Sequence, residues 1–153
     1  MSGFIAGAPV PASHINSDPY WPSVDLETVR AALRIDASVT EARLETAVVA
    51  AMIEVNRGLA EWRAAQQAQG YASLDQVPAE PINGISGLVH LYLRAVQAGA
   101  GAEIIERYRG YDTTNSGERN AEAIQDLRDE YRRDQRWALS DLVGRRRMTV
   151  ELI

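Results

Sequence analysis

The sequence of 153 residues contains no cysteine and no lysine, so all sixteen of its cationic side chains are arginines. The absence of cysteine excludes disulfide bonds, thiolate catalysis and zinc sites built from thiolates. Histidine is scarce as well, and neither His14 nor His90 has a carboxylate or second histidine at the spacing of a metal site. No nucleotide-binding or nucleophile motif is present in its required context. We therefore predict that the protein is not an enzyme and uses no cofactor.

Long apolar runs are also absent, since eighteen apolar residues nowhere stand together. We expect no membrane span. The opening residues lack a basic leader, and Pro9 and Pro11 interrupt the only apolar stretch, so we expect no secretion signal. The net charge of -5 argues against a free-standing binder of duplex DNA, which more often has a basic balance. The length predicts one folded domain.

Prolines concentrate at the start of the chain, where residues 1–24 contain four of the six. This segment shows no periodicity, so we predict an extended arm. Tyr20 and Trp21 are exceptions within it, because both rings favour burial with one polar tip hydrogen-bonded. We expect this pair to anchor the arm against the domain or against a neighbouring subunit.

Apolar residues at steps of three and four predict helices in the rest of the chain. A short helix follows the capping residue Asp25, and a long helix runs from about residue 40 to residue 69, where Gly70 ends it. Residues 70–84 are predicted to form a loop in which Pro78 and Pro81 prevent regular structure. Leu74 and Val77 of this loop are expected to pack on the core.

Two further long helices are predicted, from near Ile85 to about residue 108 and from Ser116 to Gly144. Gly99 and Gly101 lie within the first, where each costs about 1 kcal/mol relative to alanine. Close helix packing is the expected reason, and a kink is the alternative. The charged outer face of the last helix is predicted to be solvated. The fold class is thus all-α, a small bundle of three long helices and one short N-terminal helix.

The segment ERYRGYD, residues 106–112, interleaves arginine and tyrosine in a pattern that can hold phosphates and stack bases. However, Tyr108 continues the apolar stripe of its helix, and Gly110 stands where the chain must turn. Arg107 and Arg109 would then lie in the last turn, where the helix dipole favours cations. We predict a helix end, with nucleic-acid contact as the alternative.

The last residues have a different period, since Met148, Val150 and Leu152 alternate with Thr149 and Glu151. This alternation is typical of a half-buried strand. A lone strand in a helical chain must find its backbone partners elsewhere, in a neighbouring copy or at the sheet edge of another protein.

The order of these segments resembles the head completion protein family of contractile-tailed phages. The resemblance runs from about Asp18 to the end, and its most specific parts are ERYRG at residues 106–110, Asp134-x-Arg136-Trp137 and the closing strand. It implies a structural virion protein that docks on the portal vertex after DNA packaging, stabilises the filled head and provides the attachment site for the tail. It further implies helical subunits in a ring of twelve around the DNA channel.

The partners implied by the resemblance are the portal protein, neighbouring copies and a tail-side completion protein, with no membrane. Packaged DNA would pass through the channel without sequence-specific binding. The implied location is the head-tail connector of the virion, after assembly in the host cytoplasm. The alternative is a small helical DNA-binding regulator that contacts the DNA backbone through residues 106–112 or the arginines of the last helix.

On this interpretation the chain divides into an arm (1–24), a helical connector domain (25–144) and a docking strand (145–153). We expect the isolated protein to be monomeric or weakly associated, with residues 1–20 and 145–153 ordering only on the portal. Portal docking is expected at Arg145, Arg146, Arg147, Met148, Val150 and Leu152. Subunit-interface or structural roles are expected for Tyr20, Trp21, Arg107, Tyr108, Arg109, Gly110, Arg136 and Trp137.

Overall fold

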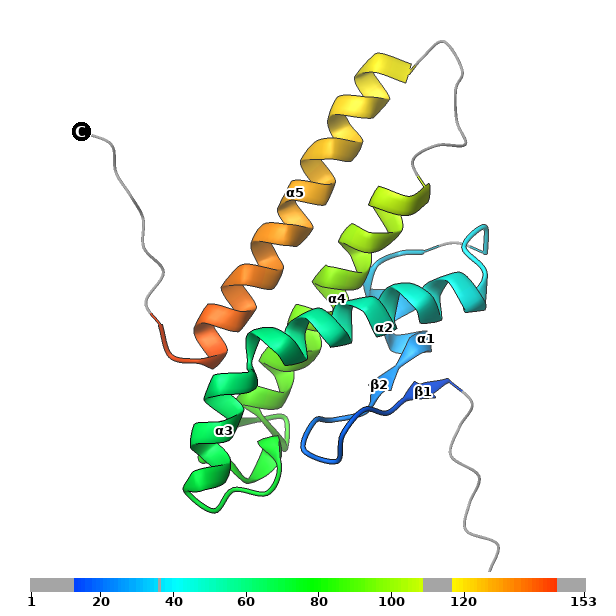
Figure 1. Ribbon diagram of the computed structural model, residues 1–153. Coiled ribbons are helices and arrows are strands. Elements are labelled where there is room, and N and C mark those ends of the chain that lie inside the picture. The colour runs from blue at the N-terminus through cyan, green and yellow to red at the C-terminus, as the bar shows by residue number, and fades with distance from the viewer. Residues whose placement is uncertain (1–12, 36, 109–116, 146–153) are drawn as a thin grey trace, which may run out of the picture.

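The computed structural model describes residues 13–35, 37–108 and 117–145 (Figure 1). The chain is mostly helical, as predicted, but it also contains two small two-stranded sheets. The elements are β1 His14–Ile15, β2 Val24–Asp25, α1 Leu26–Ala32, α2 Glu41–Gly58, α3 Ala60–Ala68, the 3-10 turn η1 Leu74–Gln76, β3 Pro81–Ile82, β4 Ile85–Ser86, α4 Gly87–Tyr108 and α5 Gly117–Leu142.

The centre of the molecule is α4, which lies beside α5 while α2 crosses it (Figure 1). Each of these helices directs its apolar stripe inward, so one core forms where the three meet. Fully buried side chains in this core include Leu44, Val48, Val55, Tyr92, Val96 and Ala138. These buried side chains thus belong to one cluster.

Gly99 and Gly101 explain how closely the helices approach α4. A Cβ at Gly99 would lie 2.6 Å from Nε2 of Gln135 and 3.0 Å from Cβ of Ala51. A Cβ at Gly101 would lie 3.0 Å from the ring of Tyr131. Because α4 continues without a break through both positions, close packing is confirmed as the reason for these glycines.

The helix predicted for residues 40–69 is wrong in one respect, because the structure divides it. α2 ends at Gly58, Leu59 adopts φ −100° and ψ 3°, and α3 begins at Ala60. Gly58 weakens the helix locally, and Leu59 is completely buried, so the chain bends where a core contact requires it. The bundle therefore has a bend between α2 and α3 where one straight helix was expected.

The described part of the predicted arm is packed, and this corrects the expectation that residues up to 20 lack internal partners. β1 pairs antiparallel with β2, so that His14 opposes Asp25, and Leu26 N donates to the carbonyl of Ser13 at 2.8 Å. Tyr20 and Trp21 are only 2% and 5% exposed. Burial of the two aromatic rings holds this segment on the domain, although it contains no long helix or strand.

The loop at residues 70–84 was predicted correctly for its buried side chains but not for its backbone. Leu74 and Val77 are buried, as expected. However, β3 and β4 form a hairpin around Asn83 and Gly84, whose φ values of 54° and 75° are those of a type I′ turn. Pro81 is tolerated because it is the first residue of its strand.

The predicted helix ends agree with the structure as far as it describes them. The described part of α4 runs to Tyr108, and Arg109 and Gly110, on which the predicted helix end depends, lie outside the described residues. α5 ends at Leu142, and Gly144 has φ 75°. Arg145 N donates to Ser140 O at 2.9 Å and Gly144 N donates to Asp141 O at 3.2 Å, the two bonds of a Schellman cap. Residues 146–153, with the predicted strand, lie outside the described residues.

Candidate interaction sites

An aromatic cluster fastens residues 18–21 to α3 and α4. The Trp21 ring stacks on Tyr92 with centroids 5.0 Å apart, and Tyr20 meets Trp21 edge to face at 4.7 Å. The Arg63 guanidinium lies 4.9 Å from the Tyr20 centroid and forms an ion pair of 2.9 Å with Asp18. Cation–π contact and ion pair together hold the segment from α3, so Tyr20 and Trp21 pack within their own domain.

The ionisable groups of this cluster have shifted pKa values with separate causes. The hydrogen bond from Arg63 lowers the pKa of Asp18, and the backbone N–H of Tyr20 adds to this. Burial raises the pKa of Tyr92 to about 12, although hydrogen bonds with Ser17 and Asn56 act in the opposite direction. The Tyr92 hydroxyl donates to Asn56 Oδ1 at 2.7 Å. Both tyrosines of the cluster therefore remain neutral and act as packing groups, since burial raises the pKa of Tyr20 too.

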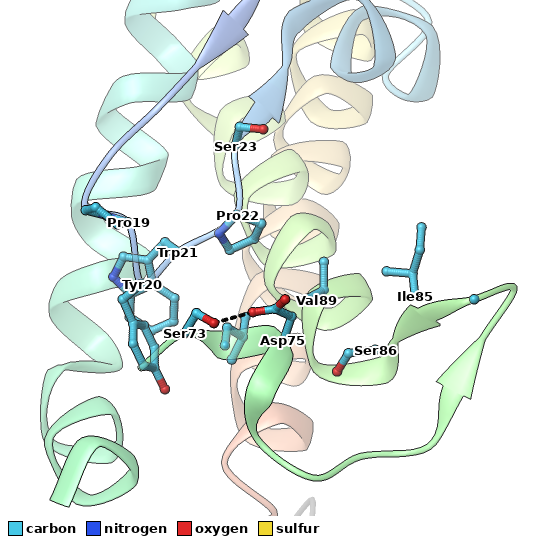
Figure 2. Close-up of a pocket in the computed structure, with 12 residues that line it drawn as sticks. Pro19, Tyr20, Trp21, Pro22, Ser23, Ser73, Asp75, Ile85, Ser86 and Val89 are labelled. Carbon is cyan, nitrogen blue, oxygen red and sulfur yellow. Dashed lines mark hydrogen bonds between the residues drawn. The ribbon is translucent and has the colours of Figure 1, made fainter. Parts of the chain in front are cut away.

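A pocket of about 440 Å³ separates this segment from η1 and the β3–β4 hairpin (Figure 2). Its lining comprises residues 19–23, 73–75 and 84–86, and Val89. The Ser73 hydroxyl donates to the Asp75 carboxylate, the only charged group of the lining. The lining itself contains no histidine and no arginine, so within it Ser73 and Asp75 have neither a neighbouring base nor a cation for a phosphate.

The described parts of the chain were compared with the geometry of metal sites and of membrane-spanning helices. Within residues 13–35, 37–108 and 117–145, no group of three or more histidine, aspartate or glutamate side chains is placed to hold a metal ion. The helices described there are also too short or too polar to cross a bilayer.

Arg132 of α5 is the centre of a polar cluster that joins three helices; we define the Arg132 cluster as Glu54, Glu103, Glu106, Arg132 and Gln135. The guanidinium donates from Nε and Nη2 to the two oxygens of Glu106, at 3.3 and 3.0 Å. Its Nη1 donates to Glu54 at 3.0 Å. Gln135 is 3% exposed and donates to Glu54 at 3.4 Å. Arg132 thus links α5 to both α2 and α4.

The charge of Arg132 is fixed by this environment. Burial lowers the pKa of Arg132, but the hydrogen bonds and charges of Glu106 and Glu54 outweigh burial, so the pKa is raised. The sequence prediction of a solvated face on α5 is therefore wrong at this position. Elsewhere on that face the structure agrees with the prediction at the exposed residues Glu122, Asp126, Asp129, Glu130, Arg133 and Arg136.

The remaining predicted residues are not gathered into one site. Arg107 pairs with Glu103 at 3.0 Å in the last turn of α4, as expected of a cation at a helix end. It lies about 22 Å along the helix from Tyr92, at 1.5 Å per residue. Arg136 and Trp137 are exposed on α5, where the Arg133 guanidinium lies 4.8 Å from the Trp137 centroid. These positions form at least two separate surfaces.

A second pocket, which we call the end pocket, lies between the α2–α3 bend and the end of α5. Its volume is about 340 Å³. The lining residues are Gly58, Leu59, Glu61, Trp62, Leu139, Ser140, Val143 and Arg145. Arg145 is the only predicted docking residue that the structure describes; Arg146, Arg147, Met148, Val150 and Leu152 lie beyond it.

The sequence was also compared with known protein families and proteins. The sequence profile of the phage head completion protein (GPL) family matches residues 15–153. A similar protein is the head completion/stabilization protein of Escherichia phage P2, which is 40% identical over 134 residues, 88% of this chain and 79% of that protein. No solved structure matches the chain.

Proposed function

Because this chain belongs to the phage head completion protein family, we propose that it docks on the portal vertex after DNA packaging, stabilises the filled head and provides the attachment site for the tail. The family confirms the resemblance found in the sequence, and it is one of structural head proteins, not of enzymes. A protein of this kind is associated with the virion. The extent of the match supports the docking proposal most directly, since it runs to Ile153 and includes the alternating segment after α5.

The described body suits a subunit that must keep its shape in a ring. Close contacts at Gly99 and Gly101 and the Arg132 cluster join α2, α4 and α5 at several points. In the proposal, twelve such bodies surround the DNA channel. The net charge of -5 would repel phosphate, so that DNA slides through without sequence-specific binding.

Docking is assigned to the segment that follows the body. Met148, Val150 and Leu152 would face the portal while the main chain adds a strand to a portal sheet edge. Arg145, Arg146 and Arg147 would steer the segment toward an acidic portal surface. Assembly would take place in the host cytoplasm.

Contacts with neighbouring copies and with the tail-side completion protein are assigned to the exposed surface of the body. Arg136 and Trp137 are candidates because both are exposed on α5. Tyr20 and Trp21 act instead within the subunit, by fixing the N-terminal segment to the core.

The experiment that tests this function compares binding to purified heads that contain portal. Truncation after Gly144, or serine at all three of Met148, Val150 and Leu152, should reduce binding at least tenfold, about 1.4 kcal/mol. Replacing Thr149 with alanine and Glu151 with glutamine on the opposite face is the matched control, and it should change binding little. If the truncated protein bound heads as well as the full chain does, the docking assignment would be wrong.

The alternative of a DNA-binding regulator has less support. Arg107 is paired with Glu103, and Arg132 is paired with Glu54 and Glu106, so their charges are offset within the protein. Binding to duplex DNA at moderate salt, with a steep salt slope that disappears when Arg107 and Arg109 are replaced, would favour the alternative.

A further inference from the structure

We propose that the end pocket holds the chain's own C-terminal segment, residues 146–153, in the unassembled protein. The apolar side chains of Met148, Val150 and Leu152 lodge in the pocket and leave it when the segment docks on the portal. The release of the segment on docking rests on the proposed function. Its binding in the pocket concerns the free protein alone.

The pocket is open to solvent, and its lining combines polar with apolar side chains. Leu59 is completely buried beneath it, and Trp62, Leu139 and Val143 are partly buried around it. Gly58 contributes no side chain, and a Cβ there would lie 3.9 Å from Cδ1 of Leu139, so the pocket stays open between Gly58 and Leu139. Three partly exposed apolar side chains beside a cavity of about 340 Å³ leave apolar area that a short segment can cover.

The path of the chain brings the C-terminal segment to this pocket. The Schellman cap at the end of α5 turns the backbone out of the helix at Gly144, and Arg145 already lines the pocket. Eight residues follow, with a reach of about 26 Å when extended, and about 10 Å of extended chain separates Met148 from Arg145. The segment therefore starts at the rim of the pocket, where its effective concentration is on the order of millimolar.

The chemistry of the segment complements the pocket. Its three apolar side chains share one face by alternation, and Arg146 and Arg147 precede them. The exposed carboxylate of Glu61 lies on the rim, where it can attract these cations at the start of the segment. The lining thus offers apolar side chains to Met148, Val150 and Leu152, and Glu61 is its one carboxylate, beside the cation of Arg145 from which the segment continues.

The pocket can hold side chains while leaving the backbone available. Its lining comes from α2, α3, α5 and the turn that follows α5, and no described strand contributes to it. The main-chain N–H and C=O groups of the segment therefore remain free to pair with a foreign sheet edge. This revises the expectation that residues 145–153 order only on the portal: their side chains are held earlier, and their backbone pairs only there.

Nuclear magnetic resonance of the tryptophan indoles tests the inference in the free protein. The full chain is compared with a chain ending at Arg145, which keeps the helix cap, and Trp62→Phe assigns the Trp62 signal. Removal of residues 146–153 should move the Trp62 indole and Leu139 methyl resonances well beyond their linewidths and leave Trp21 unchanged. A synthetic peptide of residues 146–153 should restore them saturably, whereas a scrambled peptide should not.

Two results in this comparison would overturn the inference. One is a Trp62 resonance that is identical in the full and shortened chains. The other is a difference that appears only as protein concentration rises, because the pocket would then be filled by a second copy.

A variant that fills the pocket provides an independent test. Gly58→Met directs a side chain toward Leu139 and should abolish the response of Trp62 to removal of residues 146–153. Ala65→Met, on the exposed surface of α3, is the matched control and should leave that response intact. A full response in Gly58→Met would contradict the inference. Because the filled pocket releases the segment, Gly58→Met should also bind heads severalfold more tightly than the control.

Failure of this inference and failure of the proposed function give different results. If Trp62 responds but heads bind the full and shortened chains equally, the segment rests in the pocket and the docking assignment is wrong. If Trp62 does not respond but the shortened chain fails to bind heads, docking stands and the resting site is wrong.

Discussion

Single glycines set the distances between the helices of this protein. At Gly99 an added Cβ would come within 3.0 Å of Ala51 Cβ and 2.6 Å of the buried Gln135 side chain, whereas at Gly58 the nearest atom is 3.9 Å away. We predict that Gly99→Ala lowers the free energy of unfolding by about 1–3 kcal/mol through overpacking. Gly58→Ala should leave it unchanged or raise it by up to about 1 kcal/mol through helix propensity. Urea denaturation measures both, and equal effects would contradict the packing argument.

Tyr92 should make stability depend on alkaline pH. Its pKa is about 12 in the folded protein because of burial, against about 10 in the unfolded chain. Because the pKa is higher in the folded state, neutral Tyr92 contributes fully to the free energy of unfolding below pH 10. As the pH rises from 10 to 12 this free energy falls by roughly 3 kcal/mol. Tyr92→Phe should cost stability at pH 7, because the bond to Asn56 is lost, yet flatten the decline above pH 10. An unchanged decline would contradict this assignment.

Aromatic and glycine residues were the most predictable features at this scale. The burial of Tyr20 and Trp21 followed from residue type alone. Close packing at Gly99 was predicted because a glycine within a helix lowers helix stability and therefore needs a compensating contact. The Arg132 cluster could not be predicted, because Glu106 and Glu54 stand 26 and 78 residues from Arg132 in the sequence. Only the tertiary crossing of three helices brings these charges together.

At the scale of elements, the Arg132 cluster should contribute more than the other ion pairs of α5. Arg132→Met leaves Glu54, Glu103 and Glu106 near one another without their common cation. We predict a loss of about 1–3 kcal/mol, as for other partly buried pairs that lose one partner. Arg128→Met is the control on the same helix, because Arg128 pairs with exposed Asp129, and it should cost less than about 0.5 kcal/mol.

A double-mutant cycle with Glu106→Gln separates this contribution from lost packing. Arg132 and Glu106 share a fork of two hydrogen bonds, so their coupling energy should exceed about 0.5 kcal/mol. Additive effects of the two substitutions would show that the cluster does not act as a unit.

The elements differ in how far the sequence predicts them. α4 and α5 are long enough for their period to be read directly, and their bounds were close to those observed. β1 to β4 have two residues each, too few to show any period. The Asn83-Gly84 pair was nevertheless a signal for the β3–β4 hairpin. The α2–α3 bend depends on the burial of Leu59, which no local pattern reveals.

At the scale of the whole molecule, the exposed apolar side chains bear on self-association. The large ones among the described residues are spread over α2, the β3–β4 hairpin and α5: Val49, Ile53, Ile82, Ile85, Ile124, Leu127 and Trp137. Six of them form pairs, one helical turn apart on α2 and on α5 and directly opposite in the hairpin, and pairs of this size on three separate elements do not by themselves form an interface. We therefore predict a monomer at micromolar concentration in sedimentation velocity without portal, and a stable ring in its absence would contradict this.

The proposed function requires this helical body to assemble on the portal. Electron microscopy of the protein added to purified portal tests it most directly. We predict a ring of twelve additional subunits on the portal, and the same preparation with the chain truncated after Gly144 should show bare portal. Bare portal with the full chain, or equal decoration by the truncated chain, would contradict the proposed docking.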